Sequence, residues 1–218
     1  MLGTVIKNIT GILFHIKGYK KMKFKDFLNE SIKTTVQPET KEELMKIIKD
    51  TIKEQGNKCD LNFIDTSKIK DMSRLFRGSK FNGDISEWDV SNVKDMENMF
   101  TNSKFNGDIS RWNTSKVKDM SDMFSGSEFK GDISKWNVSN VEYMSLMFYD
   151  SKFNGDLSKW NVSKVRSMAY MFDQSGFKGD ISKWDVSNVR NMEDMFKFSP
   201  LEGHEPKWYF NKLIRPVV

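Results

Sequence analysis

The chain has 218 residues, of which 38% are hydrophobic and 30% charged, and this excludes a disordered chain because enough apolar side chains are present to form a core. The net charge of +5 does not predict a nucleic-acid partner, because residues 1–56 carry 11 lysines and 7 acidic residues (+4), whereas residues 57–218 carry 24 basic and 23 acidic residues (+1). The single cysteine, Cys59, excludes an internal disulfide framework and gives no zinc-ligand spacing.

Residues 1–21 form an N-terminal segment in which apolar side chains recur at helical spacing and a lysine-rich run follows. Lys7 interrupts the apolar residues and no small-residue cleavage site follows, so the segment does not match a secretory signal peptide. Its apolar part is also shorter than the roughly 20 residues that cross a bilayer. Three interpretations stay open: an amphipathic cap, a peripheral membrane helix that is the one membrane contact, and an extension upstream of a product that begins at Met22.

Residues 22–56 are predicted to form a helical cap. Thr40 and Glu43 have the spacing of a capping box, in which the threonine hydroxyl accepts from a first-turn amide and the glutamate reaches back to the threonine N–H. The residues from Leu44 to Ile52 carry one apolar stripe, and Gly56 supplies a left-handed stop. Because the stripe needs a partner, we expect this helix to cover the segment directly downstream.

A 24-residue repeat, termed a coil below, fills the chain from residue 57 onward. All six tryptophans recur at this spacing, and a fixed period of this length is the signature of a stacked repeat. Six coils fill residues 57–200, and residues 201–218 form a degenerate C-terminal cap that keeps Trp208 in register. The first coil is divergent, with Cys59 at the glycine position and Ile64 at the tryptophan position.

Eight positions in each coil are apolar and are predicted to form the core; in the second coil they are Phe81, Ile85, Trp88, Val90, Val93, Met96, Met99 and Phe100. Ile85, Trp88 and Val90 have the spacing of a leucine-rich-repeat strand. The last four positions step by three and four, which is the period of a helix. The predicted fold is therefore an α/β solenoid: a leucine-rich-repeat-like stack of 24-residue strand-plus-short-helix coils with an N-terminal helical cap.

Turn residues recur as regularly as the core. Five coils place a glycine, which we expect at positive φ, before an aspartate: Gly83, Gly107, Gly131, Gly155 and Gly179. Asp and Asn exchange at the position represented by Asp89 and Asn113, which indicates a side-chain oxygen that accepts from backbone amides. A serine follows two residues later, where we expect it to cap the short helix.

Two ladders of equivalent residues are predicted to be structural. The tryptophan ladder could stack on sugars or bases, but its place in the strand favours core packing. The aspartate ladder could hold calcium, but each loop supplies only one Gly-Asp, so we expect turn amides and lysines to satisfy the carboxylates and no metal or cofactor to bind. The ladders are Trp88, Trp112, Trp136, Trp160 and Trp184, and Asp84, Asp108, Asp132, Asp156 and Asp180.

Positions that vary between coils are the candidates for partner contact. A basic row and three tyrosines predict a face that contacts an acidic protein partner, with the tyrosines as an aromatic hot spot. The row is Arg111, Lys135, Lys159 and Lys183, and the tyrosines are Tyr143, Tyr149 and Tyr170. No nucleophile, base and orienting group can be assembled from the two histidines, His15 and His204, and Cys59, so we expect no enzyme.

The consensus of the repeat is approximately GDISxWDVSNVxxMxxMFxxSxFN. It resembles the repeat of the BspA-like leucine-rich-repeat surface proteins, also called the Mycoplasma-lipoprotein repeat family of unknown function, over about residues 38–199. The resemblance implies a solenoid whose better-known members are surface-displayed and bind host proteins or other cells.

The functional prediction is a non-enzymatic protein-binding or adhesion module. A structural spacer of a phage particle or a cell envelope is the main alternative, and carbohydrate binding is a further one. Because the sequence shows no clear signal peptide and no lipobox cysteine, we expect a cytoplasmic or virion-associated protein and not a lipid-anchored one.

Overall fold

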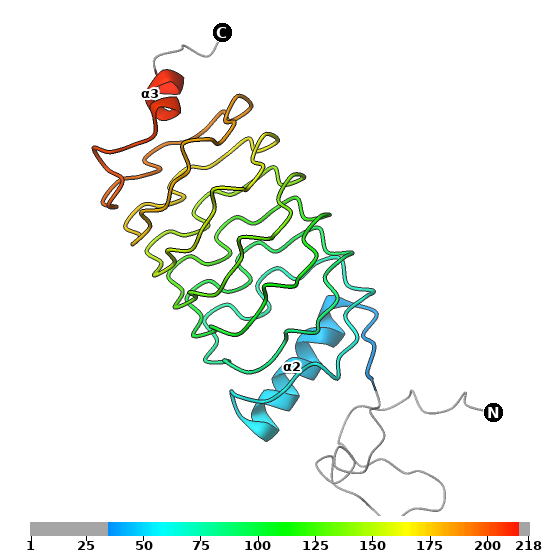
Figure 1. Ribbon diagram of the computed structural model, residues 1–218. Helices are drawn as coiled ribbons and strands as arrows, with labels where there is room; N and C mark the ends of the chain where they lie inside the picture. Colours follow the sequence, from blue (N-terminus) through cyan, green and yellow to red (C-terminus); the bar gives the residue numbers. More distant parts are fainter. Residues whose placement is uncertain (1–34, 214–218) are drawn as a thin grey trace, which may run out of the picture. The chain divides into compact units, whose positions relative to one another are not determined.

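The computed structural model describes residues 35–213, which Figure 1 colours along the chain. Residues 1–34, which include the predicted N-terminal segment and the start of the predicted cap, lie outside the described residues, as do residues 214–218. Two helices occur in the described part, α2 (Lys41–Gln55) and α3 (Lys207–Leu213). Neither of these is long and apolar enough to cross a membrane.

Between the two helices the 24-residue coils lie side by side, as Figure 1 shows from cyan to orange. Parallel β-bridges join equivalent residues of neighbouring coils. Asp60 pairs with Asp84, and a second column of bridges runs through Asp71, Asp95, Asp119, Tyr143, Ser167 and Asn191. Backbone hydrogen bonds keep the same register, for example from the Phe124 N–H to the Met147 carbonyl at 2.9 Å. Residues one repeat apart are therefore neighbours in space.

The core consists of the apolar positions of the coils. In the second coil all eight of these side chains are at most 3% exposed. Phenylalanine rings form two ladders: the centroids of Phe105 and Phe129 lie 6.3 Å apart, and those of Phe100 and Phe124 lie 5.6 Å apart. The ladders meet where one coil passes into the next, as at Phe124 and Phe129, 4.5 Å apart. Each coil thus buries its rings against neighbouring coils, and the core is shared along the array.

The short helix predicted in each coil does not form. In the described chain no helix lies between α2 and α3, and segments such as residues 97–102 form turns. Their amides are used between coils: the Asn98 N–H donates to the Ser121 carbonyl at 2.9 Å, whereas an α-helix would need that amide for its own hydrogen bonds. Asn98 and Asn102 also have φ of 58° and 55°, a left-handed conformation that ends a right-handed helix. The predicted strand of the second coil, from Ile85 to Val90, does not form either, and the recurring bridges lie at Asp95 and its equivalents, within the segment predicted as helix.

The glycines that precede the aspartates are needed for space, and the expected positive φ is wrong for them. Positive φ occurs among the described glycines only at Gly56, Gly78, Gly126 and Gly203. A Cβ on Gly131 would lie 2.7 Å from Cζ of Phe129, and the other four glycines of the set meet the phenylalanine two residues earlier in the same way. The first coil has asparagine in place of that phenylalanine, which explains why Cys59 can occupy the glycine position there.

Helix α2 has the predicted threonine cap with one change. The Thr40 Oγ1 accepts from the Glu43 N–H at 3.2 Å, but the Glu43 carboxylate accepts from the Glu39 N–H at 2.8 Å and not from Thr40. Gly56 ends the helix with φ of 88°. On the apolar stripe, Leu44 is buried in the same core as the coils. Helix α2 therefore covers the start of the array.

Candidate interaction surface

The tryptophan ladder lies in the core. Its five members are 3–4% exposed. Each indole Nε1–H donates to a backbone carbonyl of the preceding coil, as from Trp136 to Ile109 at 3.0 Å. Trp208 makes the equivalent bond from α3 to Ile181 at 2.9 Å. Because the rings are buried and stacked, they offer no open face to a sugar or a base.

The aspartate ladder is satisfied inside its own turns. Each carboxylate accepts from the backbone N–H of the serine two residues later, at 2.8–2.9 Å. The Ser134 hydrogen bonds lower the pKa of Asp132, and the charge of Lys135 lowers it further. No group of three or more His, Cys, Asp or Glu side chains placed to hold a metal occurs among residues 35–213. The ladder is thus a set of turn-forming acceptors.

The second Asp/Asn position of each coil works in the same way. The Asp89 Oδ1 accepts from the Ser91 N–H at 2.9 Å, and the Asn137 Oδ1 accepts from the Ser139 N–H at 3.1 Å. The serines expected to cap a helix with their hydroxyls therefore act through their amides, as part of a turn.

The predicted basic row lies at the surface of the first turn of its coils. Arg111, Lys135, Lys159 and Lys183 are all exposed, and we term them the turn row. Successive members of the row are one coil apart. The ring centroids of Trp112 and Trp136, which are also one coil apart, lie 6.3 Å from each other. Each cation follows a ladder aspartate by three residues and helps to lower its pKa. Each coil of the row thus carries one exposed cation with an aspartate close by.

The three tyrosines do not form one aromatic cluster. Tyr143 is 41% exposed in the second bridge column. The Tyr149 hydroxyl accepts from Nε2 of Gln174 at 2.7 Å. Hydrogen bonding with Glu193 raises the pKa of Tyr170. Within the described residues no ring contact joins the three, and they lie at least eight residues beyond the turn row in their coils. The structure therefore places the basic and aromatic parts of the predicted face in different segments of the coil.

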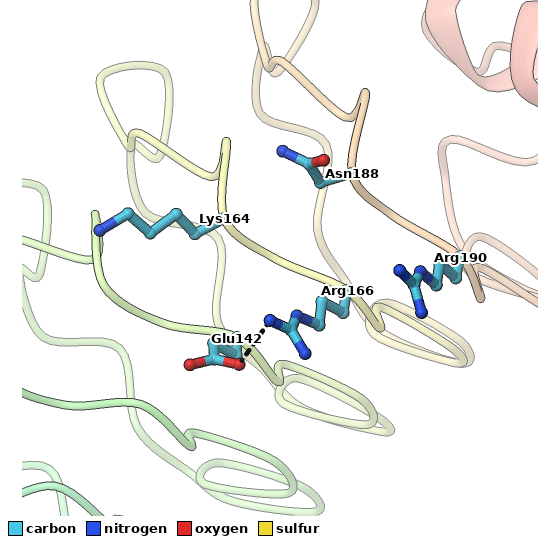
Figure 2. Close-up of a pocket in the computed structure, with 5 residues that line it drawn as sticks. All are labelled: Glu142, Lys164, Arg166, Asn188 and Arg190. Atoms are coloured by element: carbon cyan, nitrogen blue, oxygen red, sulfur yellow. Dashed lines mark ion pairs between the residues drawn. The ribbon is translucent and has the colours of Figure 1, made fainter.

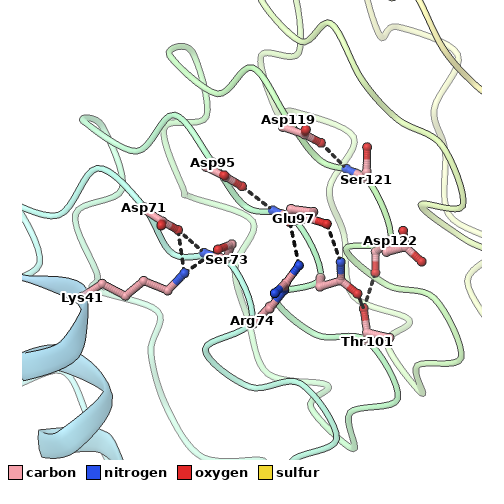
Figure 3. Close-up of polar contacts among 11 residues, drawn as sticks. Lys41, Asp71, Ser73, Arg74, Asp95, Glu97, Thr101, Asp119, Ser121 and Asp122 are labelled. Atoms are coloured by element: carbon pink, nitrogen blue, oxygen red, sulfur yellow. Dashed lines mark hydrogen bonds and ion pairs between the residues drawn. The ribbon is translucent and has the colours of Figure 1, made fainter.

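An acidic column, which was not predicted from the sequence, occupies the second bridge column (Figure 3). Asp71, Asp95 and Asp119 follow one another on three coils, and each accepts from the backbone N–H two residues later at 2.7–2.8 Å. Burial raises the pKa of Asp95, and the charges of Asp71, Asp119 and Glu97 raise it further. Lys41 of α2 pairs with Asp71 at 2.9 Å and so neutralises one end of the column.

A basic hollow, also not predicted from the sequence, lies in the later coils (Figure 2). It is an open depression of about 280 Å³, lined by Glu142, Lys164, Arg166, Asn188 and Arg190. The Glu142 carboxylate lies 3.4 Å from the Arg166 guanidinium and 3.5 Å from the Lys118 amine.

The sequence does contain a signal for both features. The residue before the bridge column is lysine in the first three coils, and an aspartate follows it each time, as in Lys94-Asp95. In the last two coils the pair becomes Arg166-Ser167 and Arg190-Asn191. Comparing this position across coils would therefore have indicated an acidic column at one end and uncompensated positive charge at the other.

Comparison with known proteins adds a family. A family model described as Mycoplasma protein of unknown function, DUF285, matches residues 44–151 and again residues 125–213. The two matches together take in the whole coil array. No curated protein and no solved structure matches the chain.

Proposed function

The chain belongs to the DUF285 family of Mycoplasma-type proteins of unknown function, and we propose that it is a non-enzymatic repeat module that binds a protein partner through an exposed face of its coils. The proposal includes a finer classification, a leucine-rich-repeat-like solenoid of the BspA-like type. Parallel bridges between residues one repeat apart and ring ladders at the same spacing support that classification. Solenoids bind through extended faces that equivalent positions of successive repeats create.

The observation that carries the proposal is the exposure of the turn row on four successive coils. The core positions are buried, and the Asp, Asn and Ser positions of the turns are engaged in backbone hydrogen bonds. The turn-row side chains act on their own coil only through the charge of the neighbouring aspartate, and the row keeps one charge sign from Arg111 to Lys183. A same-sign row at fixed spacing on a shared scaffold favours contact with a partner of opposite charge.

The partner that fits the turn row is a protein surface with carboxylates spaced along a line. Long Arg and Lys side chains can extend beyond the aspartates at the base of the turn and meet such carboxylates directly. Charge pairs of this kind mainly raise the association rate and the specificity, and salt weakens them. The proposed complex is therefore expected to dissociate as the ionic strength rises.

A capture experiment with charge-reversal variants tests the proposal. The tagged full chain is compared with a variant in which all four turn-row residues are glutamate. A matched control variant carries four glutamates at exposed lysines outside the row: Lys58, Lys80, Lys130 and Lys178. Proteins retained from a cell lysate by the wild type and by the control, but lost from the turn-row variant, support the proposal.

The alternatives give different results in the same experiment. A spacer retains no protein whose capture depends on the turn row. A carbohydrate-binding protein retains glycans on an array, and that binding does not change when the turn row is reversed; the buried tryptophan ladder gives this alternative no stacking surface.

A further inference from the structure

Two arginines border the basic hollow on successive coils. Arg166 and Arg190 occupy equivalent positions, and the Arg190 N–H donates to the Arg166 carbonyl at 2.8 Å, which fixes the two backbones side by side. Figure 2 shows both guanidinium groups extending in the same direction. Lys164 and Asn188 also line the hollow, and the Lys164 side chain extends away from the two guanidinium groups. Like charges that face each other on neighbouring coils repel each other, and an anion placed between them offsets the repulsion.

The hollow contains more positive than negative charge. Its lining has three cations, Lys164, Arg166 and Arg190, and one carboxylate, Glu142. Glu142 is shared, because it lies near both Arg166 and Lys118. Within residues 35–213, Arg190 makes no ion pair, and the Lys164 amine is bonded to the neutral Asn140 Oδ1 at 2.6 Å. The hollow is therefore short of negative charge.

The position of Arg166 and Arg190 carries lysine in the first coils, where the charge is balanced differently. Lys70 and Lys94 have the same backbone relation as the arginines, with the Lys94 N–H donating to the Lys70 carbonyl at 2.8 Å. Each of these lysines is followed by an aspartate of the acidic column, whereas serine and asparagine follow the arginines. The change from lysine to arginine also matters, because a guanidinium presents a planar fork of N–H donors that fits two oxygens of one anion.

We propose that the hollow is a binding site for a tetrahedral oxyanion of the phosphate type. Arg166 and Arg190 donate forked hydrogen bonds to its oxygens, and Lys164 adds charge from the rim. A phosphate group, with three or more acceptor oxygens and close to two negative charges near neutral pH, offsets the cationic excess of the lining. The site uses none of the turn-row residues, so the phosphate proposal can be refuted or supported independently of the proposed partner binding.

Calorimetric titration of the full chain with inorganic phosphate at low ionic strength tests the site. We expect saturable binding with one site per chain. The double variant Arg166→Gln/Arg190→Gln should weaken it at least about tenfold, because two charge-assisted forks are lost. The matched variant Lys70→Gln/Lys94→Gln removes the same charge from the same column and should bind phosphate as the wild type does. Binding that does not saturate, or that both variants weaken equally, would overturn the proposal.

The melting temperature of each variant shows whether that variant is folded. If the double variant is unfolded, Arg190→Gln alone serves, because the Arg190 side chain makes no ion pair among the described residues. Unchanged phosphate binding by a folded Arg190→Gln variant would also overturn the proposal.

A second titration identifies where the phosphate group comes from. The probes are a short phosphoserine peptide and the same peptide without phosphate. Tighter binding of the phosphopeptide than of inorganic phosphate indicates a group carried on a protein, and equal binding indicates the free anion. Equal binding of the two peptides would contradict the site, because the phosphate would then contribute nothing.

Discussion

The indole Nε1–H of Trp136 donates a hydrogen bond at 3.0 Å to the carbonyl oxygen of Ile109, which lies 27 residues earlier in the preceding coil. The same bond recurs at every tryptophan of the chain, with N···O distances of 2.9–3.2 Å. Tryptophan therefore has two roles here: its ring fills the core, and its N–H joins one coil to the previous one. Tryptophan is suited to this buried position because its polar N–H finds an acceptor in the preceding coil.

Losing that N–H should destabilise the fold measurably. Trp136→Phe keeps an aromatic ring, removes the indole N–H with part of the ring volume, and leaves the Trp112 backbone N–H as the remaining donor to the Ile109 carbonyl. The lost hydrogen bond should cost ~0.5–1.5 kcal/mol. Trp136→Ala also removes the ring contacts and should cost ~3–5 kcal/mol. Urea unfolding followed by circular dichroism measures both. A Trp136→Phe protein as stable as the wild type would show that the bond contributes nothing.

Two glycines in different surroundings give a second test. Gly131→Ala places a Cβ 2.7 Å from the buried Phe129 ring, and this overpacking should cost ~1–3 kcal/mol. At Gly176, an alanine Cβ would meet no heavy atom within 4 Å, and the backbone there does not have positive φ. Gly176→Ala should therefore change the free energy of unfolding by less than ~1 kcal/mol. Equal costs at the two positions would contradict the steric explanation.

Asp95→Asn should stabilise the protein at neutral pH. Asparagine keeps the acceptor for the Glu97 N–H, as Asn191 does for Glu193 at 3.0 Å, and removes the repulsion from Asp71 and Asp119. We expect a gain of ~0.2–1 kcal/mol at pH 7. Because the pKa of Asp95 is raised in the folded state, the wild type loses stability as the pH rises from the unfolded pKa through the folded pKa. The advantage of the variant should therefore shrink as the pH falls through that range.

Asp132→Asn should have the opposite sign. Hydrogen bonds from Ser134 lower the pKa of Asp132 in the folded state, so its charge contributes stability above the unfolded pKa, and this is lost as the pH falls through the folded pKa. The variant should melt at a lower temperature than the wild type at pH 7, and the difference should disappear in acid. Thermal melts of both asparagine variants in the same buffers make the comparison, and two shifts of the same sign would refute it.

Calcium should leave the melting temperature unchanged. The ladder carboxylates already accept backbone N–H groups at 2.8–2.9 Å, and each coil offers only one of them. A bound ion would stabilise the folded chain by mass action and raise the melting temperature. Scans with calcium and with a chelator that differ by several degrees would show that the ladder binds the ion.

Much of the architecture follows from the sequence because the repeat has no insertions. The period fixes which residues are neighbours, and apolar residue type alone locates core positions such as Ile85, Trp88 and Met96. The Asx role of Asp89 also follows, because exchange with asparagine preserves only an acceptor oxygen.

The predicted short helix, the expected positive φ of the glycines and the missed basic hollow have a common physical origin. Met96, Met99 and Phe100 have helical spacing, but that spacing also suits a turn whose amides bond to the next coil, and periodicity within one coil cannot separate the two. Gly131 was expected at positive φ because glycine permits it, whereas the requirement came from the Phe129 ring. The basic hollow depends on Arg166 and Arg190 of different coils, so it appears only when coils are compared with one another.

Both the proposed partner face and the proposed phosphate site depend on coils that stack in register, with residues 24 apart as neighbours. Cysteines introduced at the bridge-paired Tyr143 and Ser167 test this register directly, with Tyr143 and Asn191, which lie two coils apart, as the control pair. A disulfide needs Cα atoms within about 7 Å, a distance that one coil spacing satisfies and two do not. On mild oxidation of the folded monomer, the Tyr143→Cys/Ser167→Cys protein should form an intramolecular disulfide and the control should not. Efficient cross-linking of the control pair, or none in the paired one, would contradict the in-register stack.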